Sequence, residues 1–384
     1  MDRRTLLKLA AGLPAALGLP SRAMAAPERP APPVLVLLEL NGGNDGLNTV
    51  APWRDARYRS LRPTLALGAD AVLPLDEGLA MHRALEPLLP WWRRGELAWV
   101  TGVGCRPPNR SHFRAIAIWD HASTADPPPE HGWLAPWLAR LRRPGSHADA
   151  VVLGRNPAPV TGSGARVAVM KDIDTFLRQA RRLDAVRAGT PNPALAHILA
   201  VEARTRAWAR ELEAAISPQL PGGFAPGSIG HALEDAARLI ASGAAPPVIK
   251  VAQGGYDTHA RQAAVHRRRL AELAAALAAF ATALEASGDW QRVLVMSYSE
   301  FGRRARENAS AGTDHGAAAP HFFLGGRVRG GLYGTRPDLA RLEDGDLVPG
   351  TDFRRLYSTV LEGWFGLGSA ARIPGHAPLP VLRA

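Results

Sequence analysis

Six short and almost continuous apolar runs are spaced along the chain, and each ends in a polar or glycine-rich turn. They cover residues 34–40, 96–104, 149–154, 166–170, 247–255 and 292–300. A strand that is buried on both faces reads as an unbroken apolar run, which is typical of parallel sheets. We therefore predict that these runs form one central sheet.

Helical patterns fill the intervals between the runs. Residues 262–288 place leucines and a phenylalanine on one face at heptad-like spacing, and residues 172–216 are also largely helical. Alternating strands and helices predict an α/β fold, with a mostly parallel central sheet and helices on both faces. We expect a single domain over residues 26–384, with a helical excursion around residues 171–245.

The N-terminus has the layout of an export signal. A charged start containing Arg3 and Arg4 precedes a modest apolar stretch, and a small-x-small site follows at 23–25. The arginine pair indicates a twin-arginine signal over residues 1–25 and hence a periplasmic or extracellular protein. An ordinary secretory signal is the alternative. The apolar stretch is too short and too interrupted for a membrane span.

Composition narrows the range of partners. The formal charge is +11, but only three of the 46 basic residues are lysines, and no basic run carries interleaved aromatic residues. This favours a compositional bias towards arginine and argues against nucleic-acid binding. Cys105 is the only cysteine, so an internal disulfide is excluded. With 46% hydrophobic residues, the chain can bury a substantial core.

Chemically useful side chains follow several of the predicted strands. In such sheets, ligands bind beyond the carboxyl ends of the strands, so these side chains are expected at one rim. Aspartate, glutamate and histidine suit zinc, manganese, magnesium or calcium, as one ion or two. The candidate metal ligands are Asp45, Asp257, His259, Glu300, Asp314 and His315.

Each of these signals has a simpler structural interpretation. Asp257 and Ser111 both precede helical patterns and could be N-caps. The arginines after residue 302 could form a solvated basic turn, or could hold an anionic group. The hydroxyl of Ser111 would stand at a helix N-terminus, where an anion is favoured and where a nearby metal would make it a nucleophile.

Several stretches together resemble a known group of proteins. They are "LLELNGGNDGLNTVAP", "NRSHFRAIAIWDHAS", "GGYDTHARQ", "SEFGRRARENASAGTDHG", "GGRVRGGLYG" and "TDFRRLYSTVLEGWFG". They are similar to an uncharacterised family of exported bacterial proteins, a domain of unknown function, within the alkaline-phosphatase-like superfamily of phosphatases and sulfatases. The resemblance runs in order through nearly the whole mature chain.

The resemblance implies an alkaline-phosphatase-like fold and a shared site. It implies Asp45 as the first metal ligand, Ser111 as nucleophile, and Asp257 with His259 on one metal, completed by Asp314 and His315. We expect four further residues to contact an anionic ester substrate, namely Asn44, Arg110, His112 and Arg303. Superfamily members usually carry Asp-His-Gly directly at the end of the late strand, whereas this chain has Ser-Glu-Phe-Gly there. Either Glu300 takes that ligand position, with His315 as the last imidazole, or the strand-end site is lost.

These observations favour an exported, metal-dependent hydrolase of phosphate or sulfate esters. The alternative is an exported binding or assembly protein on the same fold whose site has decayed. A metal-free Ser-His-Asp hydrolase would use Ser111, but no Gly-x-Ser-x-Gly motif is present. A sulfatase-type nucleophile at Cys105 would require Cys-x-Pro-x-Arg, and the arginine here falls one position late.

Overall fold

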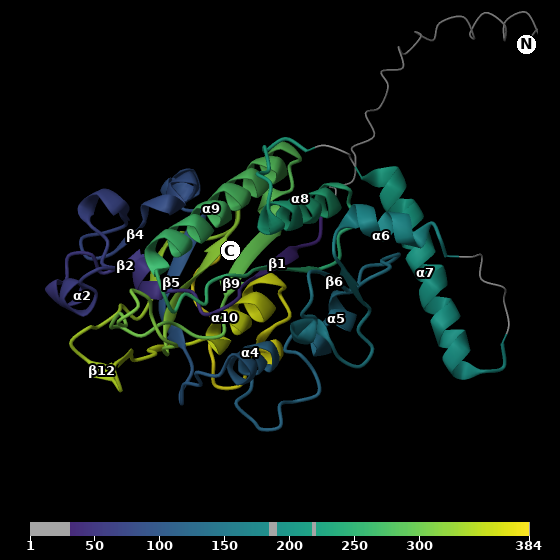
Figure 1. Ribbon diagram of the computed structural model, residues 1–384. Helices are drawn as coiled ribbons and strands as arrows, with labels where there is room; N and C mark the ends of the chain where they lie inside the picture. The colour runs from purple at the N-terminus through teal and green to yellow at the C-terminus, as the bar shows by residue number, and fades with distance from the viewer. Residues whose placement is uncertain (1–30, 184–189, 217–219, 384) are drawn as a thin grey trace, which may run out of the picture. The chain divides into compact units, whose positions relative to one another are not determined.

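A computed structural model describes residues 31–183, 190–216 and 220–383. Residues Pro32–Ala384 form one compact unit (Figure 1). The expected export signal over residues 1–25 lies outside the described residues. No helix in the described ranges is long and apolar enough to pass through a lipid bilayer.

A nine-stranded sheet forms the centre of the compact unit. The main strand order is β11-β5-β10-β9-β1-β8-β6-β7, and β14 also pairs with β5. Only β10 runs antiparallel to its neighbours, between β9 and β5. The strands are β1 (Val34–Leu40), β5 (Leu97–Gly104), β6 (Ala150–Leu153), β7 (Val167–Met170), β8 (Val248–Gln253), β9 (Val293–Tyr298), β10 (Ala319–Leu324), β11 (Gly331–Gly334) and β14 (Thr351–Asp352).

This sheet confirms the predicted fold class. All six apolar runs form strands of the sheet, namely β1, β5, β6, β7, β8 and β9. Strand β10 was not predicted, because it begins with Ala-Pro after a glycine- and alanine-rich stretch, and this start reads as a loop. The result is a mixed sheet that is parallel except at this one strand.

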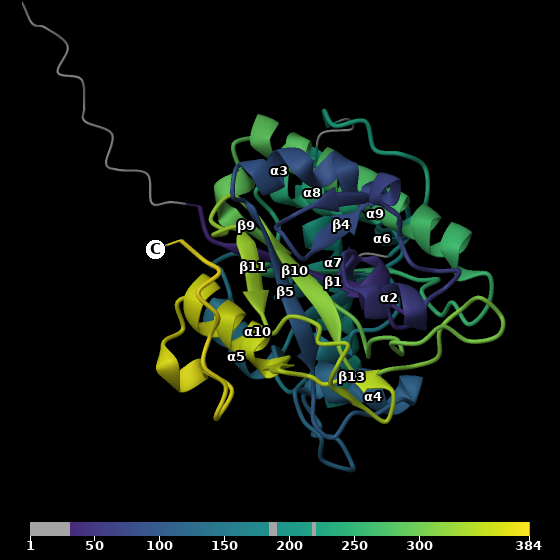
Figure 2. The ribbon, with the colours of Figure 1, turned by 90° about the vertical axis from the view of Figure 1, so that its left-hand side faces the viewer.

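Helices cover both faces of the sheet (Figures 1 and 2). Alternate residues of β1 point into two separate cores: Val34 and Val36 pack with α8 and α9, whereas Leu35 and Leu37 pack with α4, α5 and α10. This division follows from the two-residue period of a strand. The helices are α3 (Leu89–Arg93), α4 (His112–His121), α5 (Ala135–Leu141), α8 (Ser228–Ala241), α9 (Gln262–Ala286) and α10 (Arg354–Ser358).

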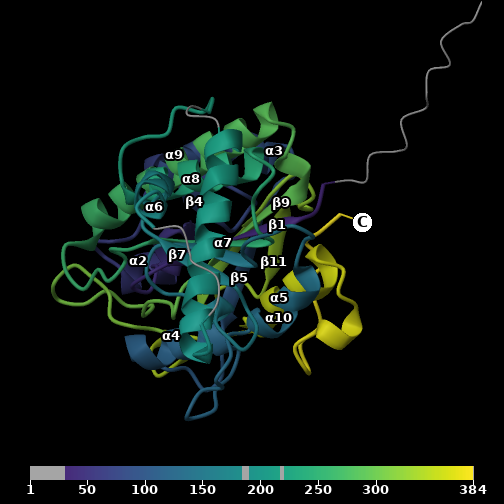
Figure 3. The same ribbon diagram turned by 90° about the vertical axis from the view of Figure 1, so that its right-hand side faces the viewer.

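Smaller elements surround the sheet. Three helices, among them α8, lie in the stretch where the sequence predicts a helical excursion, and α7 lies beside the β7 end of the sheet (Figure 3). A short hairpin of β12 and β13 follows β11. The remaining elements are α2 (Ala56–Leu61), α6 (Ile173–Ala180), α7 (Pro193–Ala215), β2 (Val50–Ala51), β3 (Val72–Pro74), β4 (Ala80–His82), β12 (Leu342–Glu343) and β13 (Asp346–Leu347).

Candidate metal centre

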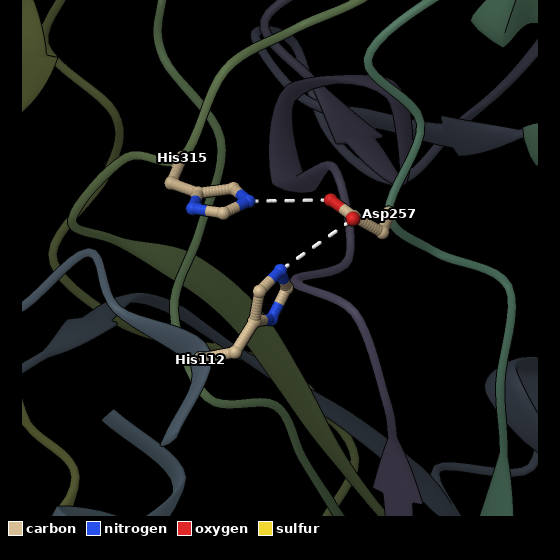
Figure 4. A group of neighbouring side chains, drawn as sticks. All are labelled: His112, Asp257 and His315. Carbon is tan, nitrogen blue, oxygen red and sulfur yellow. Dashed lines mark hydrogen bonds and ion pairs between the residues drawn. The ribbon is translucent and has the colours of Figure 1, made fainter. Parts of the chain in front are cut away.

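Two imidazoles and a carboxylate converge beyond the carboxyl ends of the central strands (Figure 4). Asp257 follows β8, His112 is the first residue of α4, and His315 lies in the loop between β9 and β10. Nε2 of His315 is 3.2 Å from Asp257 Oδ1, and Nε2 of His112 is 3.5 Å from Asp257 Oδ2. One potential ligand atom from each residue lies within 4.8 Å of the others.

His259 brings a third imidazole to the same place. Its Nε2 is 3.1 Å from Asp257 Oδ1 and 3.0 Å from Nε2 of His315. The ring centroids of His259 and His315 are 4.8 Å apart. Asp257 therefore stands among three imidazoles and presents oxygen atoms to the Nε2 atom of each.

The Nδ1 atom of each of these three histidines lies within hydrogen-bonding distance of an oxygen acceptor. A histidine that donates from Nδ1 carries its proton there, which leaves the lone pair on Nε2. Partners of this kind fix the tautomer and ring orientation of metal-binding histidines. The acceptors are Glu300 Oε1 for His112 at 3.0 Å, Asp314 Oδ1 for His259 at 3.1 Å, and the main-chain oxygen of Arg110 for His315 at 2.8 Å.

This arrangement fits a divalent cation. With both Nδ1 atoms donating, the Nε2 atoms of His259 and His315 face each other as two lone pairs at 3.0 Å. Such a contact is repulsive unless a positive charge lies against it. Imidazole nitrogens with one carboxylate oxygen are a ligand set that zinc and other transition metals prefer. The donor atoms present are therefore suited to a single metal ion.

The charge states favour metal binding at neutral pH. Partial burial would raise the pKa of Asp257, but the hydrogen bond from Arg303 and the charge of its guanidinium outweigh it and hold that pKa at about 2. Burial lowers the pKa of His315, and the charges of Arg303 and His112 add to this effect. Asp257 is thus ionised and His315 neutral, which are the forms that bind metals.

Two glycines allow the loop carrying His315 to reach the site. A Cβ atom on Gly312 would lie 2.2 Å from the carbonyl carbon of His259, and one on Gly316 would lie 2.4 Å from that of Arg303. Neither distance is possible for a real side chain. The sequence Gly-Thr-Asp-His-Gly therefore lets the segment with Asp314 and His315 pack closely against the His259 loop and against the start of its own loop at Arg303.

Arg303 connects the loops of the site through hydrogen bonds from its guanidinium. Its side chain is fully buried, and its guanidinium donates to main-chain oxygens of Gly42, Gly43, Tyr256 and Thr313. It also donates to Asp257 Oδ1 at 2.6 Å. This placement differs from the expected contact with substrate, because a guanidinium that is buried and saturated with acceptors has no face towards a ligand. Arg303 instead ties the strand-end loops together.

Asp45 and Asn44 lie in a separate buried network. Asp45 is fully buried, and its Oδ2 accepts from Arg62 at 2.6 Å and from Gln262. The side chain of Asn44, also buried, contacts Thr49 and His266. The structure does not bring Asp45 into the imidazole group, because the buried Arg62 pairs with its carboxylate. Nor does it expose Asn44 to a substrate.

Ser111 is exposed next to His112. It is the N-cap residue of α4, and its hydroxyl makes no cap hydrogen bond. Its main-chain N–H donates to Asn109 Oδ1 at 3.0 Å. Within the described ranges no histidine is hydrogen-bonded to this hydroxyl, so the Ser-His contact of a metal-free triad is missing.

Two neighbouring side chains have other roles. The Arg110 guanidinium pairs with the buried Asp346 of β13, with Nε 2.9 Å from Oδ2, while its main chain supports His315. Burial raises the pKa of the Cys105 thiol to about 11, and nearby Asp352 adds to this effect. A thiol with so high a pKa is a poor nucleophile at neutral pH.

The structure therefore brings five of the six predicted ligands together and leaves Asp45 in a separate network. Asp257, His259 and His315 face the centre, whereas Glu300 and Asp314 stand behind His112 and His259. His112 was expected at the substrate and instead faces Asp257. The one sequence signal for this role was its position in the first turn of a helix after a strand end.

The Glu300 contact leads to a specific expectation. Replacing Glu300, which is 4% exposed, by glutamine should weaken Zn²⁺ binding by about 10–100-fold, because the amide holds the His112 ring less firmly than a carboxylate does. Calorimetric titration of metal-stripped protein measures this change. Glu86→Gln, at an exposed position, should change nothing. If Glu300→Gln binds Zn²⁺ with unchanged affinity, His112 is not a ligand of the metal.

The fold and these side chains define an α/β protein with a cluster of three histidines and an aspartate at the carboxyl edge of its sheet. Residues 119–375 match the family model described as "Protein of unknown function (DUF1501)". The chain belongs to this family. No curated protein matches it in sequence.

Three solved structures illustrate the more distant similarities. The lipoteichoic acid synthase LtaP of Listeria monocytogenes has 10% identity and a TM-score of 0.36, covering 89% of this chain and 74% of its own. A protein in the alkaline phosphatase superfamily from Vibrio parahaemolyticus has 11% identity and a TM-score of 0.34, with coverage of 80% and 64%. A phosphonate monoester hydrolase of Silicibacter pomeroyi has 12% identity and a TM-score of 0.35, with coverage of 90% and 78%. With TM-scores this low, these similarities support no statement about function, which has to come from this chain's own side chains.

Proposed function

We propose that the protein is an exported, metal-dependent hydrolase of phosphate or sulfate esters, with Ser111 as its nucleophile. The observation that carries the proposal is the convergence of three Nε2 atoms on the Asp257 carboxylate, each ring fixed by an acceptor at Nδ1. A metal ion bound there would polarise an ester oxygen and offset the charge that develops during transfer.

The position of Ser111 supports its role. Ser111 is the N-cap residue of α4 and directly precedes His112, the first residue of the helix. Its hydroxyl is therefore close in the sequence to a side chain of the candidate metal centre. The first N–H groups of a helix are unpaired within the helix and carry partial positive charge. They would bind the non-reacting oxygens of the ester while the Ser111 oxygen attacks phosphorus or sulfur. The alcohol would leave, and the serine ester would then be hydrolysed by water.

The other residues hold this geometry. Asp257 supplies the negative charge of the centre, and Glu300 and Asp314 orient the rings of His112 and His259. His315 is fixed by the Arg110 main chain. The Arg110 side chain is 35% exposed and directly precedes Ser111 in the sequence, so it would meet the anionic group of the substrate.

Replacement of Ser111 by alanine tests the proposal. We expect the rate of p-nitrophenyl phosphate or sulfate hydrolysis to fall by at least about 100-fold, because the nucleophile is lost. The bound metal should remain, since the hydroxyl contacts none of the proposed ligands. Ser60→Ala, on α2, is the matched control and should keep full activity.

The outcome also separates the two candidate functions. Wild-type protein that binds metal but hydrolyses neither ester would favour the binding or assembly protein. Equal activity of wild type and Ser111→Ala would exclude Ser111 as nucleophile. Activity that survives complete removal of metal would contradict the metal-dependent mechanism itself.

A further inference from the structure

A groove runs along the outer edge of the sheet, on elements that take no part in the metal centre. It encloses about 530 Å³ and is lined by residues of β7 and of the long helix α7. Figure 3 shows these two elements beside each other. Residues 164–168 form one wall, and the other wall consists of side chains on one face of α7, which are His197, Val201, Arg204, Thr205 and Trp208. The volume is in the range of ordinary ligand sites.

The β7 wall is an open strand edge. β7 pairs with β6 on one side and has no strand partner on the other in the described part of the chain. Every second main-chain N–H and C=O of such a strand points outwards and can accept another strand. The groove therefore borders the unpaired edge of β7 at Val167 and Ala168, and residues of α7 line its opposite side.

The groove is positively charged. Arg142 and Arg166 share one buried carboxylate, Asp149, at 2.8 and 2.7 Å, so one positive charge remains between them. Arg204 is exposed and has no ionic partner among the described residues. His147, which lines the groove, pairs with Glu211 at 3.0 Å. No acidic residue lines the groove.

Apolar side chains are also available to an occupant. Phe176 and Trp208 line the groove in contact with each other, with ring centroids 5.1 Å apart. Val201 of α7, which also lines the groove, is 39% exposed. An extended chain that adds to β7 would place alternate side chains against these apolar groups.

We propose that this groove binds an extended, acidic segment of a partner protein, which adds to β7 as a further strand. The main-chain groups of β7 supply the pairing, the arginines select acidic side chains, and Phe176 and Val201 receive the alternate apolar ones. This is the strand-addition mode of peptide recognition. It does not depend on the hydrolase proposal, because the groove shares no residue with the metal centre.

A labelled peptide of alternating glutamate and valine, acetylated and amidated at its ends, tests the proposal by fluorescence anisotropy with the full chain. We expect saturable binding that Arg204→Glu weakens by about tenfold or more, because the change reverses a charge at the groove. Arg210→Glu, at an exposed position on α7 outside the groove, is the matched control and should bind as wild type does.

Two further peptides make the outcome decisive. A lysine-valine peptide should fail to bind, and a glutamate-valine peptide N-methylated at alternate residues should bind much more weakly, because methylation removes the donors for strand pairing. Equal binding of the N-methylated peptide, or no effect of Arg204→Glu, would overturn the proposal. So would sedimentation showing that the chain self-associates through β7, which would make a second copy the occupant.

Discussion

Replacing Asp257 with asparagine should leave the purified protein almost without a bound divalent ion. Asp257 is the one carboxylate that meets the Nε2 atoms of His112, His259 and His315, and it is ionised because its pKa is held at about 2. Without its charge the imidazoles bind a cation more weakly, and the neutral amide also adds N–H groups that repel it. We expect Zn²⁺ affinity to fall by at least about 100-fold.

Elemental analysis after dialysis, together with calorimetric titration of metal-stripped protein, measures this effect. Asp70→Asn changes an exposed aspartate elsewhere and should leave metal content unaltered. Hydrolysis of p-nitrophenyl esters should disappear with the metal. If Asp257→Asn retains wild-type metal content, the group around Asp257 is a polar cluster and not a metal centre.

Arg303→Met should strongly destabilise the fold. The change leaves buried main-chain oxygens in three loops without a donor, and it removes the cation beside Asp257. Removing one partner from a buried, hydrogen-bonded charge of this kind costs about 3–5 kcal/mol. The free energy of unfolding, from denaturant titration followed by fluorescence, should fall by that amount.

The neighbouring arginine provides the control. Arg304 is 37% exposed and reaches Asp346 only at 4.0 Å, so Arg304→Met should cost less than about 1 kcal/mol. Arg303→Lys should not restore stability, because one ammonium group cannot donate in the several directions that the guanidinium does. A loss of less than 1 kcal/mol in Arg303→Met would mean that the loops are held by other contacts.

The sequence predicted the sheet well because the relevant signal is local. Burial on both faces makes each parallel strand apolar throughout, and this is visible in a window of seven residues such as 34–40. β10 escaped notice because its Ala-Pro start resembles a loop, although all its residues are buried. Strand β10 is defined by its pairing with β9 and β5. Both strands lie too far away in the sequence for a short window around β10 to include them.

The same distinction applies to the candidate site. The sequence by itself determined which residues are available at the strand ends, and it placed Asp257, His259 and His315 together there, because parallel strands deliver their C-terminal loops to one edge. It could not show that Asp45 meets the buried Arg62, that Arg303 points inwards, or that His112 turns towards Asp257. Those outcomes depend on side-chain partners contributed by distant segments. Only the tertiary structure brings the partners within hydrogen-bonding distance. These contacts decide whether a carboxylate, an imidazole or a guanidinium faces the candidate metal position or holds another side chain in place.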